Sequence, residues 1–96
     1  MLEIRRICEN CGKSLSNDSD EAMICTFECT FCRECVENIL LNVCPNCGGG
    51  LEKRPTRPKS LLVKYPPKTE ELLQPVDAEK FKSVLEKYQN IKPNQR

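Results

Sequence analysis

The sequence predicts a small, metal-stabilised α+β fold, and three observations lead to this prediction. The chain has 96 residues but only five aromatic side chains and no tryptophan, which leaves little material for a hydrophobic core. All eight cysteines lie within the first 50 residues, a usage far above the average for proteins. Five of the seven prolines fall between residues 51 and 76, where they prevent long regular elements.

Short strands are expected around the first cysteines. Leu2 and Ile4 alternate with polar neighbours, which predicts a short strand leading into the first cysteine pair. Residues 14–21 are polar and turn-forming, so they predict an exposed loop. Residues 22–27 are rich in β-forming side chains and predict a second strand.

One short helix is expected after Cys35. Apolar residues recur there with the spacing i, i+3, i+4 and i+7, at Val36, Ile39, Leu40 and Val43. This spacing predicts two helical turns that end before Pro45. The predicted core of this half consists of seven apolar side chains: Ile7, Met23, Ile24, Phe27, Phe31, Ile39 and Leu40.

Three segments follow one another along the chain: a cysteine-rich module over residues 1–50, a basic Pro-rich linker over 51–76, and a C-terminal amphipathic helix over 77–92. Asp77 is the predicted N-cap of that helix. One apolar stripe runs along it, at Phe81, Val84, Leu85 and Tyr88. Because a short isolated helix is marginal in water, we expect this stripe and residues 61–63 to complete the core. The alternative is a homodimer face.

The cysteines predict two metal sites. They are Cys8, Cys11, Cys25, Cys29, Cys32, Cys35, Cys44 and Cys47. Zinc takes four soft ligands in a tetrahedron, and a Cys-x2-Cys turn presents two sulfurs to one ion. Gly12 and Gly48 follow such pairs and let the amide groups point at the sulfurs, while Pro45 fixes φ in the last pair. Eight ligands make two closed sites, so the prediction is two structural Zn²⁺ ions.

Other uses of the cysteines are weighed against zinc. Four disulfides need an oxidising compartment, and the charged N-terminus carries no apolar export signal. The run from Cys25 to Cys35 is compatible in principle with an iron–sulfur cluster. A Cys-x-x-Cys redox couple needs a βαβ context, which this sequence lacks.

Histidine is absent, which excludes Ser-His-Asp and Cys-His catalysis and histidine–metal sites. No apolar run approaches the ~20 residues of a membrane span, so no membrane partner is expected. Reduced thiols and the missing signal predict a cytoplasmic protein.

Spacing alone leaves three ways to group the ligands. Consecutive pairing groups 8/11/25/29 and 32/35/44/47. Nested pairing groups 8/11/44/47 around 25/29/32/35. Cross-brace pairing groups 8/11/32/35 and 25/29/44/47.

Charge is distributed unevenly along the chain. Residues 1–50 carry four Lys or Arg and eight Asp or Glu, a net −4, whereas residues 51–96 carry eleven and six, a net +5. The basic linker segment 53–68 is expected to be solvated. Its alternatives are phosphate contacts with a nucleic acid or packing against the acidic module. Residues 65–68 suit a polyproline II helix and a groove-binding ligand.

The cysteine spacing resembles a RING finger in which Cys29 replaces the usual histidine. Phe31 precedes the fifth ligand, a helix follows the sixth, and Pro45 follows the seventh. This resemblance covers residues 8–47 and implies the cross-brace, with Cys8, Cys11, Cys32 and Cys35 in one site and Cys25, Cys29, Cys44 and Cys47 in the other. It also implies a ubiquitin-ligase-like role. Ligases usually have an apolar residue where this chain has Asn10 and a basic residue where it has Gly48.

A closer resemblance covers nearly the whole chain. Segments such as Met1-Leu2-Glu3, Ala22-Met23-Ile24-Cys25, Val43-Cys44-Pro45-Asn46-Cys47-Gly48-Gly49 and Arg54-Pro55-Thr56-Arg57-Pro58 are similar to a family of small bacterial cysteine-rich proteins. That family is catalogued only as a domain of unknown function. The resemblance implies a bacterial cytosolic origin and supplies no activity.

The sequence-based hypothesis is a non-enzymatic, zinc-stabilised protein–protein interaction or regulatory module whose partner is another protein. Residues 36–43 and the neighbouring loops are the expected partner surface. One alternative is a RING-type ubiquitin-ligase-like adaptor. The other is a nucleic-acid-binding regulator that uses the basic tail.

Overall fold

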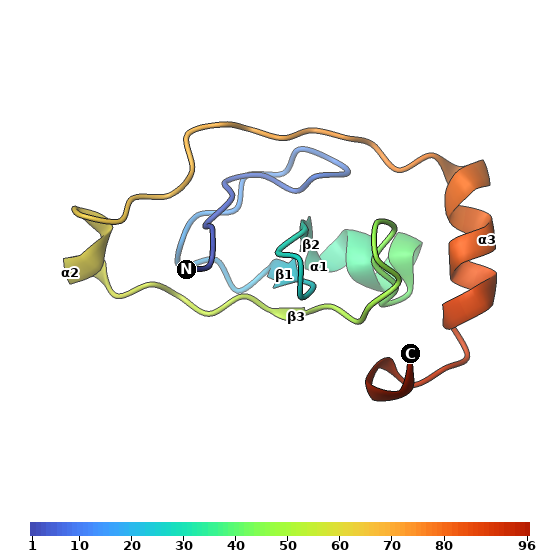
Figure 1. Ribbon diagram of the computed structural model, residues 1–96. Helices are drawn as coiled ribbons and strands as arrows, with labels where there is room; N and C mark the ends of the chain where they lie inside the picture. Colours follow the sequence, from blue (N-terminus) through green and yellow to red (C-terminus); the bar gives the residue numbers. More distant parts are fainter.

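Three short antiparallel strands form the centre of the fold. In the computed structural model, which describes residues 1–96, β1 (Ala22–Ile24) is the middle strand, with β2 (Thr30–Cys32) on one side and β3 (Glu52–Lys53) on the other (Figure 1). Met23 is paired with Phe31 of β2 and with Lys53 of β3. β3 lies in the segment for which the sequence predicts a linker, and its pairing attaches residues 51–54 to the cysteine-rich half.

One continuous helical segment follows β2. It consists of the short helix α1 (Arg33–Cys35) and the π-helical turn η1 (Val36–Leu40), so it begins inside the Cys32–Cys35 pair, earlier than the spacing predicts. Leu41, in the left-handed region with φ 48°, ends it. Val36, Leu40 and Val43 are buried as predicted, but Ile39 is 50% exposed. The wider π turn explains this error, because it rotates side chains away from the positions of a regular 3.6-residue spiral.

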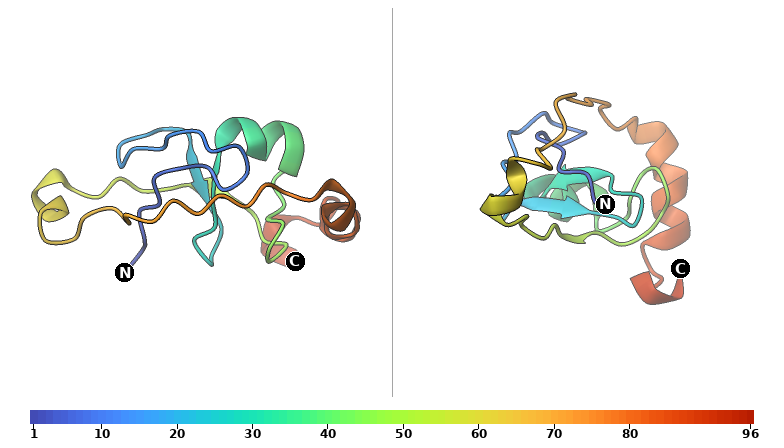
Figure 2. Two further views of the ribbon diagram at one scale, coloured as in Figure 1. Left: turned by 90° about the horizontal axis from the view of Figure 1, so that it is seen from above. Right: turned by 60° about the vertical axis from the view of Figure 1, so that its left-hand side comes forward.

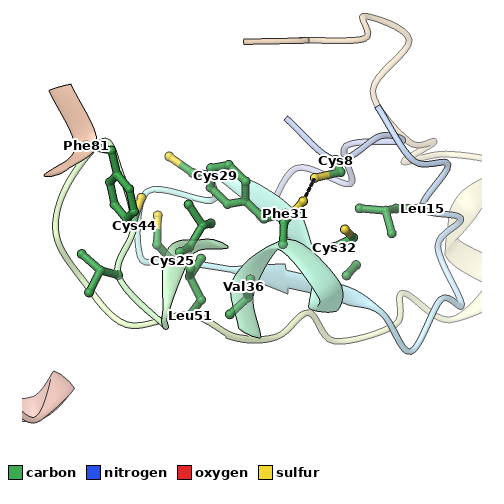
Figure 3. Packing of buried hydrophobic residues seen from close by; sticks show 14 residues of the cluster. Cys8, Leu15, Cys25, Cys29, Phe31, Cys32, Val36, Cys44, Leu51 and Phe81 are labelled. Carbon is green, nitrogen blue, oxygen red and sulfur yellow. Dashed lines mark hydrogen bonds between the residues drawn. The ribbon is translucent and has the colours of Figure 1, made fainter. Parts of the chain in front are cut away.

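The core lies around the cysteines and differs in part from the predicted set. Phe31 and Leu40 are buried, but Phe27 is 71% exposed, because it lies in the turn between Cys25 and Cys29. Ile7, Met23 and Ile24 are only partly buried. Four buried apolar residues are absent from the predicted core set: Ile4, Leu15, Ala22 and Leu51. Figure 3 shows how the cysteines, Phe31 and Phe81 share this interior.

The N-terminal segment is not a strand, contrary to the prediction. Ile4 is buried, yet its carbonyl accepts a hydrogen bond from Lys68 of the C-terminal half rather than from a strand neighbour. A single antiparallel bridge joins Ile7 and Ser14. The predicted exposed loop over residues 14–21 turns Leu15 into the core while its polar side chains stay at or near the surface.

The C-terminal half contains three short helices: α2 (Lys59–Leu62), α3 (Ala78–Tyr88) and the 3-10 turn η2 (Pro93–Gln95). Asp77 caps α3 as predicted, because its carboxylate accepts hydrogen bonds from the backbone N–H groups of Glu79 and Lys80. The stripe of α3 packs against the cysteine-rich core, with Phe81 buried and Val84, Leu85 and Tyr88 partly buried. The expectation that residues 61–63 complete the core is wrong, since Val63 is 92% exposed and Leu61 is 45% exposed.

Residues 66–77, which we call the strap, connect α2 and α3. They run beside residues 4–10 in the same direction: Lys68 N–H donates to the Ile4 carbonyl and Gln74 N–H to the Glu9 carbonyl, each at 2.8 Å. Figure 1 shows the strap running alongside the N-terminal segment, and Figures 1 and 2 show α2 and α3 at opposite ends of an elongated molecule of 42 × 25 × 19 Å. None of the helices combines the length and the apolar composition that a membrane span requires.

Arg54 joins the two halves and corrects the expectation of a solvated linker. It is 1% exposed, and its guanidinium donates from Nη1 to the Arg5 carbonyl at 2.7 Å and from Nη2 to the Ser16 carbonyl at 2.8 Å. Arg57 likewise donates to the carbonyls of Leu2 and Tyr65. These two arginines lie on the cysteine-rich module because arginine satisfies several buried carbonyls at once.

Candidate metal centre

Four sulfurs come together between the N-terminal turn and the start of α1. The sulfurs of Cys8, Cys11, Cys32 and Cys35 all lie within 4.8 Å of one another. Cys8 Sγ is 3.8 Å from Cys35 Sγ, and Cys11 Sγ is 3.6 Å from Cys32 Sγ. Neither consecutive nor nested pairing brings these four residues together. We call this group the four-sulfur cluster.

A second group lies at the other end of the core. It contains the sulfurs of Cys25, Cys44 and Cys47, again within 4.8 Å of one another, and we call it the three-sulfur cluster. Cys29 is not part of this group, although its carbonyl accepts a hydrogen bond from the Cys25 N–H at 3.3 Å. Figure 3 shows Cys25, Cys29 and Cys44 in the same part of the core, next to Phe81 of α3.

Each cluster contains a turn of the same sequence type, Cys-x-Asn-Cys-Gly, at residues 8–12 and 44–48. In both turns the glycine N–H donates to the carbonyl of the first cysteine, at 2.9 Å for Gly12 and 2.8 Å for Gly48. The two glycines have φ values of 78° and 77°, a conformation that glycine adopts without strain. The same backbone turn therefore presents two sulfurs in each cluster.

The asparagine of each turn donates its side-chain amide to a cysteine from outside the turn. Asn10 Nδ2 donates to Cys35 Sγ, and Asn46 Nδ2 donates to Cys29 Sγ, each at 3.3 Å. Sequence reasoning treated Asn10 only as a departure from the ligase pattern and gave Asn46 no role. The signal that could have found both is the repeated Cys-x-Asn-Cys-Gly motif.

The asparagines also connect the clusters to the rest of the fold. Asn10 Oδ1 accepts from the Val76 N–H of the strap at 2.9 Å. Asn46 Nδ2 also donates to the buried carboxylate of Glu9 at 3.0 Å, and Glu9 lies inside the first turn. The two clusters are therefore joined through a single side-chain contact.

Burial is the largest single influence on the pKa of five cysteine thiols. It raises the pKa values of Cys29, Cys32, Cys35 and Cys44 above the ordinary value for a thiol. For Cys44 the neighbouring thiols Cys29 and Cys25 raise the pKa further. Burial opposes ionisation of Cys8 as well, but backbone N–H groups of Cys11, Cys32 and Asn10 outweigh it and lower the pKa of that thiol. Thiolates in this environment need a cation or N–H donors to be stable.

The arginines next to the clusters do not contact the sulfurs. Arg33 donates to the Asp20 carbonyl at 3.0 Å and lies 4.0 Å from Glu37. Arg5 lies near Glu3 and Glu9. The contacts of these two arginines therefore do not indicate that either one screens thiolate charge.

The donor set fits a tetrahedral zinc ion. A metal–sulfur distance of ~2.3 Å in a tetrahedron implies sulfurs about 3.8 Å apart. The sulfur distances of 3.6 and 3.8 Å in the four-sulfur cluster agree with this spacing. Such a group could hold a soft divalent ion, and four sulfur ligands would leave no free coordination position for water or substrate.

Comparisons with known proteins agree with the cysteine-rich description. A family model described as "Protein of unknown function (DUF1272)" matches residues 1–57. An uncharacterised protein of Rhizobium meliloti (strain 1021) is 56% identical over 75 residues, which cover 78% of this chain and 89% of that protein. No solved structure matches the chain.

Proposed function

This chain belongs to the family described as protein of unknown function (DUF1272), and from its cysteine geometry we propose that it is a structural zinc protein. The two Zn²⁺ ions are held in a cross-brace. Cys8, Cys11, Cys32 and Cys35 bind one ion, and Cys25, Cys29, Cys44 and Cys47 bind the other. The protein acts as a non-enzymatic interaction or regulatory module.

The observation that carries this proposal is the repeated turn with its asparagine. Asn10 donates to Cys35, which is a member of the four-sulfur cluster. Asn46 makes the equivalent bond to Cys29. Cys35 and Cys29 therefore occupy equivalent positions, each next to the asparagine of one turn. Because Cys35 is a member of its cluster, we assign Cys29 as the fourth ligand of the three-sulfur cluster. Amide donors to ligand sulfurs are the contacts that stabilise metal-bound thiolates.

A structural role follows from the closed ligand sets. A catalytic zinc keeps one coordination position for water, whereas four thiolates occupy all positions. The small core supports the same assignment, because metal binding supplies the folding free energy that few apolar side chains provide in a chain of this size.

The proposed partner surface is the helical segment 36–43 with its neighbouring loops. Ile39 is 50% exposed on this segment and Leu41 is also exposed, so two large apolar side chains lie in solvent on either side of the buried Leu40 in the sequence. Two of the linker's basic residues, Arg54 and Arg57, donate to main-chain carbonyls. Phosphate contacts through the tail would therefore depend on its lysines.

Native mass spectrometry of the intact chain tests the zinc assignment. We expect two zinc ions per chain, one after Cys29→Ser, and one after the matched substitution Cys35→Ser in the other cluster. Two retained ions in the Cys29→Ser variant would remove Cys29 from the ligand set. Iron or disulfides in the purified protein would contradict the proposal as a whole.

Affinity purification tests the interaction role. We expect a specific partner protein to be retained by the wild-type chain and lost with Ile39→Ser, at unchanged zinc content and circular dichroism. Lys82→Gln, an exposed change on α3, serves as the control and should retain the partner. A ubiquitin-like conjugation product formed in the presence of the chain would favour the ligase alternative instead.

A further inference from the structure

The α2 end of the molecule carries exposed apolar side chains that the cysteine clusters do not explain. Val63 directly follows α2 and is 92% exposed, Leu61 is 45% exposed, and Met1 is 83% exposed. Figures 1 and 2 show α2 projecting at one extremity, at the opposite end from α3. We call this region, consisting of residues 59–65 with Met1, the α2 tip.

A shallow apolar hollow joins Met1 to α2. It has a volume of about 300 Å³ and is lined by side chains from three segments, among them Leu2, Ile4, Pro55, Leu61 and Tyr65. A second hollow of about 300 Å³ shares Met1, Leu2, Ile4 and Tyr65 with the first and extends to Lys64 and Lys68. The apolar surface of the tip is therefore continuous with its basic surface.

The chain segment that forms the tip carries charge of one sign. Residues 53–68 contain six Lys or Arg and no Asp or Glu. Lys59 and Lys64 lie on either side of Leu61 and Val63, and both lysines are exposed. Lys68 is paired with Glu3 and Lys53 with Asp20, so those two cations are partly neutralised. Lys59 has Asp18 as an acidic neighbour, while the ammonium of Lys64 lies 5.5 Å from the Tyr65 ring centre.

From this arrangement we propose that the α2 tip docks onto the surface of an anionic phospholipid bilayer. Leu61, Val63 and Met1 enter the headgroup region, and Lys59 and Lys64 contact the lipid phosphates. The lysines match the anionic headgroup phosphates of such a bilayer, and the projecting apolar side chains between them match the acyl chains beneath the headgroups. The occupant is favoured over an acidic protein because the exposed apolar side chains of α2 project at an extremity rather than lining a deep groove.

This inference departs from the expectation of no membrane partner. That expectation rested on the missing apolar run of ~20 residues that a spanning helix needs. Attachment at a surface needs no such run. The inference concerns a different face from residues 36–43 and does not depend on the identity of a protein partner.

Vesicle sedimentation with the zinc-loaded full chain tests the proposal. We expect binding to vesicles containing phosphatidylserine, no binding to pure phosphatidylcholine vesicles, and weakening as salt rises. Loss of one lysine charge should weaken binding about fivefold, so Lys59→Gln/Lys64→Gln should weaken it about 25-fold. Lys82→Gln/Lys87→Gln on α3 is the matched control, since Lys87 also lies over a tyrosine ring, and it should bind as the wild type does.

A second pair of variants separates the contribution of apolar contacts to vesicle binding from the contribution of charge. Leu61 and Leu72 are 45% and 44% exposed, so Leu61→Ser and Leu72→Ser remove the same side chain from equally accessible positions. We expect only Leu61→Ser to weaken vesicle binding, with zinc content unchanged in both. The proposal would be overturned if vesicle binding fell equally in the tip and control variants, or if the wild-type chain did not bind anionic vesicles at low salt. A dimer that Leu61→Ser dissociates would also overturn it, because a second copy would then cover the tip.

Discussion

The cysteine-rich half, residues 1–54, and the C-terminal half, residues 55–96, are held together by different kinds of contact. The first half combines a three-stranded sheet, two Cys-x-Asn-Cys-Gly turns and the two sulfur clusters. The second half has no sheet and reaches the first through single long-range contacts, such as the Lys68 bond to Ile4 and the burial of Phe81. Its helices pack on the first half rather than on one another.

This difference shows where each half obtains its stability. Contacts in the first half converge on the two sulfur clusters, so on the proposed zinc assignment we expect that half to fold cooperatively with metal binding. Contacts in the second half are separate hydrogen bonds and one apolar stripe, each of ordinary strength. The two halves should therefore respond very differently to loss of metal and to single substitutions.

Metal removal is the strongest way to test this comparison. Apparent binding free energies of structural zinc in small modules are ~10–16 kcal/mol per site, more than the small core supplies. We therefore expect a strong chelator to unfold residues 1–54 and to release α3 from the core. Circular dichroism and amide NMR spectra before and after chelation measure this change. Native-like spectra without metal would contradict it.

Arg54 is the next strongest point, because it anchors the last residue of the first half, directly before the second half begins. Its guanidinium satisfies the carbonyls of Arg5 and Ser16 on either side of the buried Leu15. A lysine ammonium cannot reach both carbonyls with the same geometry. We expect Arg54→Lys to lower the free energy of unfolding by about 3 kcal/mol, measured by urea unfolding at fixed free zinc.

The control for Arg54 is its neighbour on β3. Lys53 is exposed and paired only with Asp20, so Lys53→Gln should change the free energy of unfolding by less than about 0.5 kcal/mol. Equal effects at the two positions would show that Arg54 is an ordinary surface cation.

Alanine substitutions at the two turn glycines, Gly12 and Gly48, allow a direct comparison of the two clusters. Both have φ near 77°, so an alanine at either position costs roughly 1–2 kcal/mol of backbone strain. At Gly12 the nearest atom to an added Cβ is a Leu73 methyl at 3.6 Å, whereas at Gly48 it is the Tyr88 ring at 2.5 Å. We expect Gly48→Ala to cost about 3 kcal/mol, more than Gly12→Ala, because α3 must move away from the turn.

The double variant Gly48→Ala/Tyr88→Ala checks the cause of that difference. Removing the ring leaves only the backbone strain at residue 48, so the effects of the two substitutions should be less than additive. Additive effects in urea unfolding would mean that α3 does not rest on the second turn.

The parts of the fold that depend on local spacing could be predicted from the sequence. The Cys-x2-Cys spacing indicated the cysteine pairs that lie together in the two sulfur clusters, Gly12 and Gly48 indicated the tight turns, and Asp77 indicated the start of α3. These signals act within a few residues. For the clusters, spacing alone left three groupings open, because which pairs meet depends on the antiparallel pairing of β1 with β2.

The parts that depend on distant contacts could not be predicted. Arg54 lies in a basic Pro-rich run, and its burial depends on carbonyls 38 to 49 residues away. The Phe27 side chain was assigned to the core from its type, but the Cys25–Cys29 turn directs it to solvent. Ile39 was misplaced because the π turn has no signature in apolar spacing.

The smallest expected effect concerns the exposed ion pair that attaches the strap to the N-terminus. Lys68 Nζ lies 3.0 Å from Glu3 Oε1, and this lysine is the main cause of the lowered pKa of Glu3, with Arg5 adding to it. A carboxyl whose pKa is lowered by folding stabilises the fold above its unfolded pKa and loses that contribution as pH falls through the folded pKa. We expect Lys68→Gln to move the pKa of Glu3 back towards its ordinary value, which NMR titration measures. The free energy of unfolding should change little, because exposed ion pairs contribute little to stability. An unchanged Glu3 pKa would mean that the strap does not hold Lys68 against residue 3 in solution, and the second half would then be attached mainly through the packing of α3 on the core.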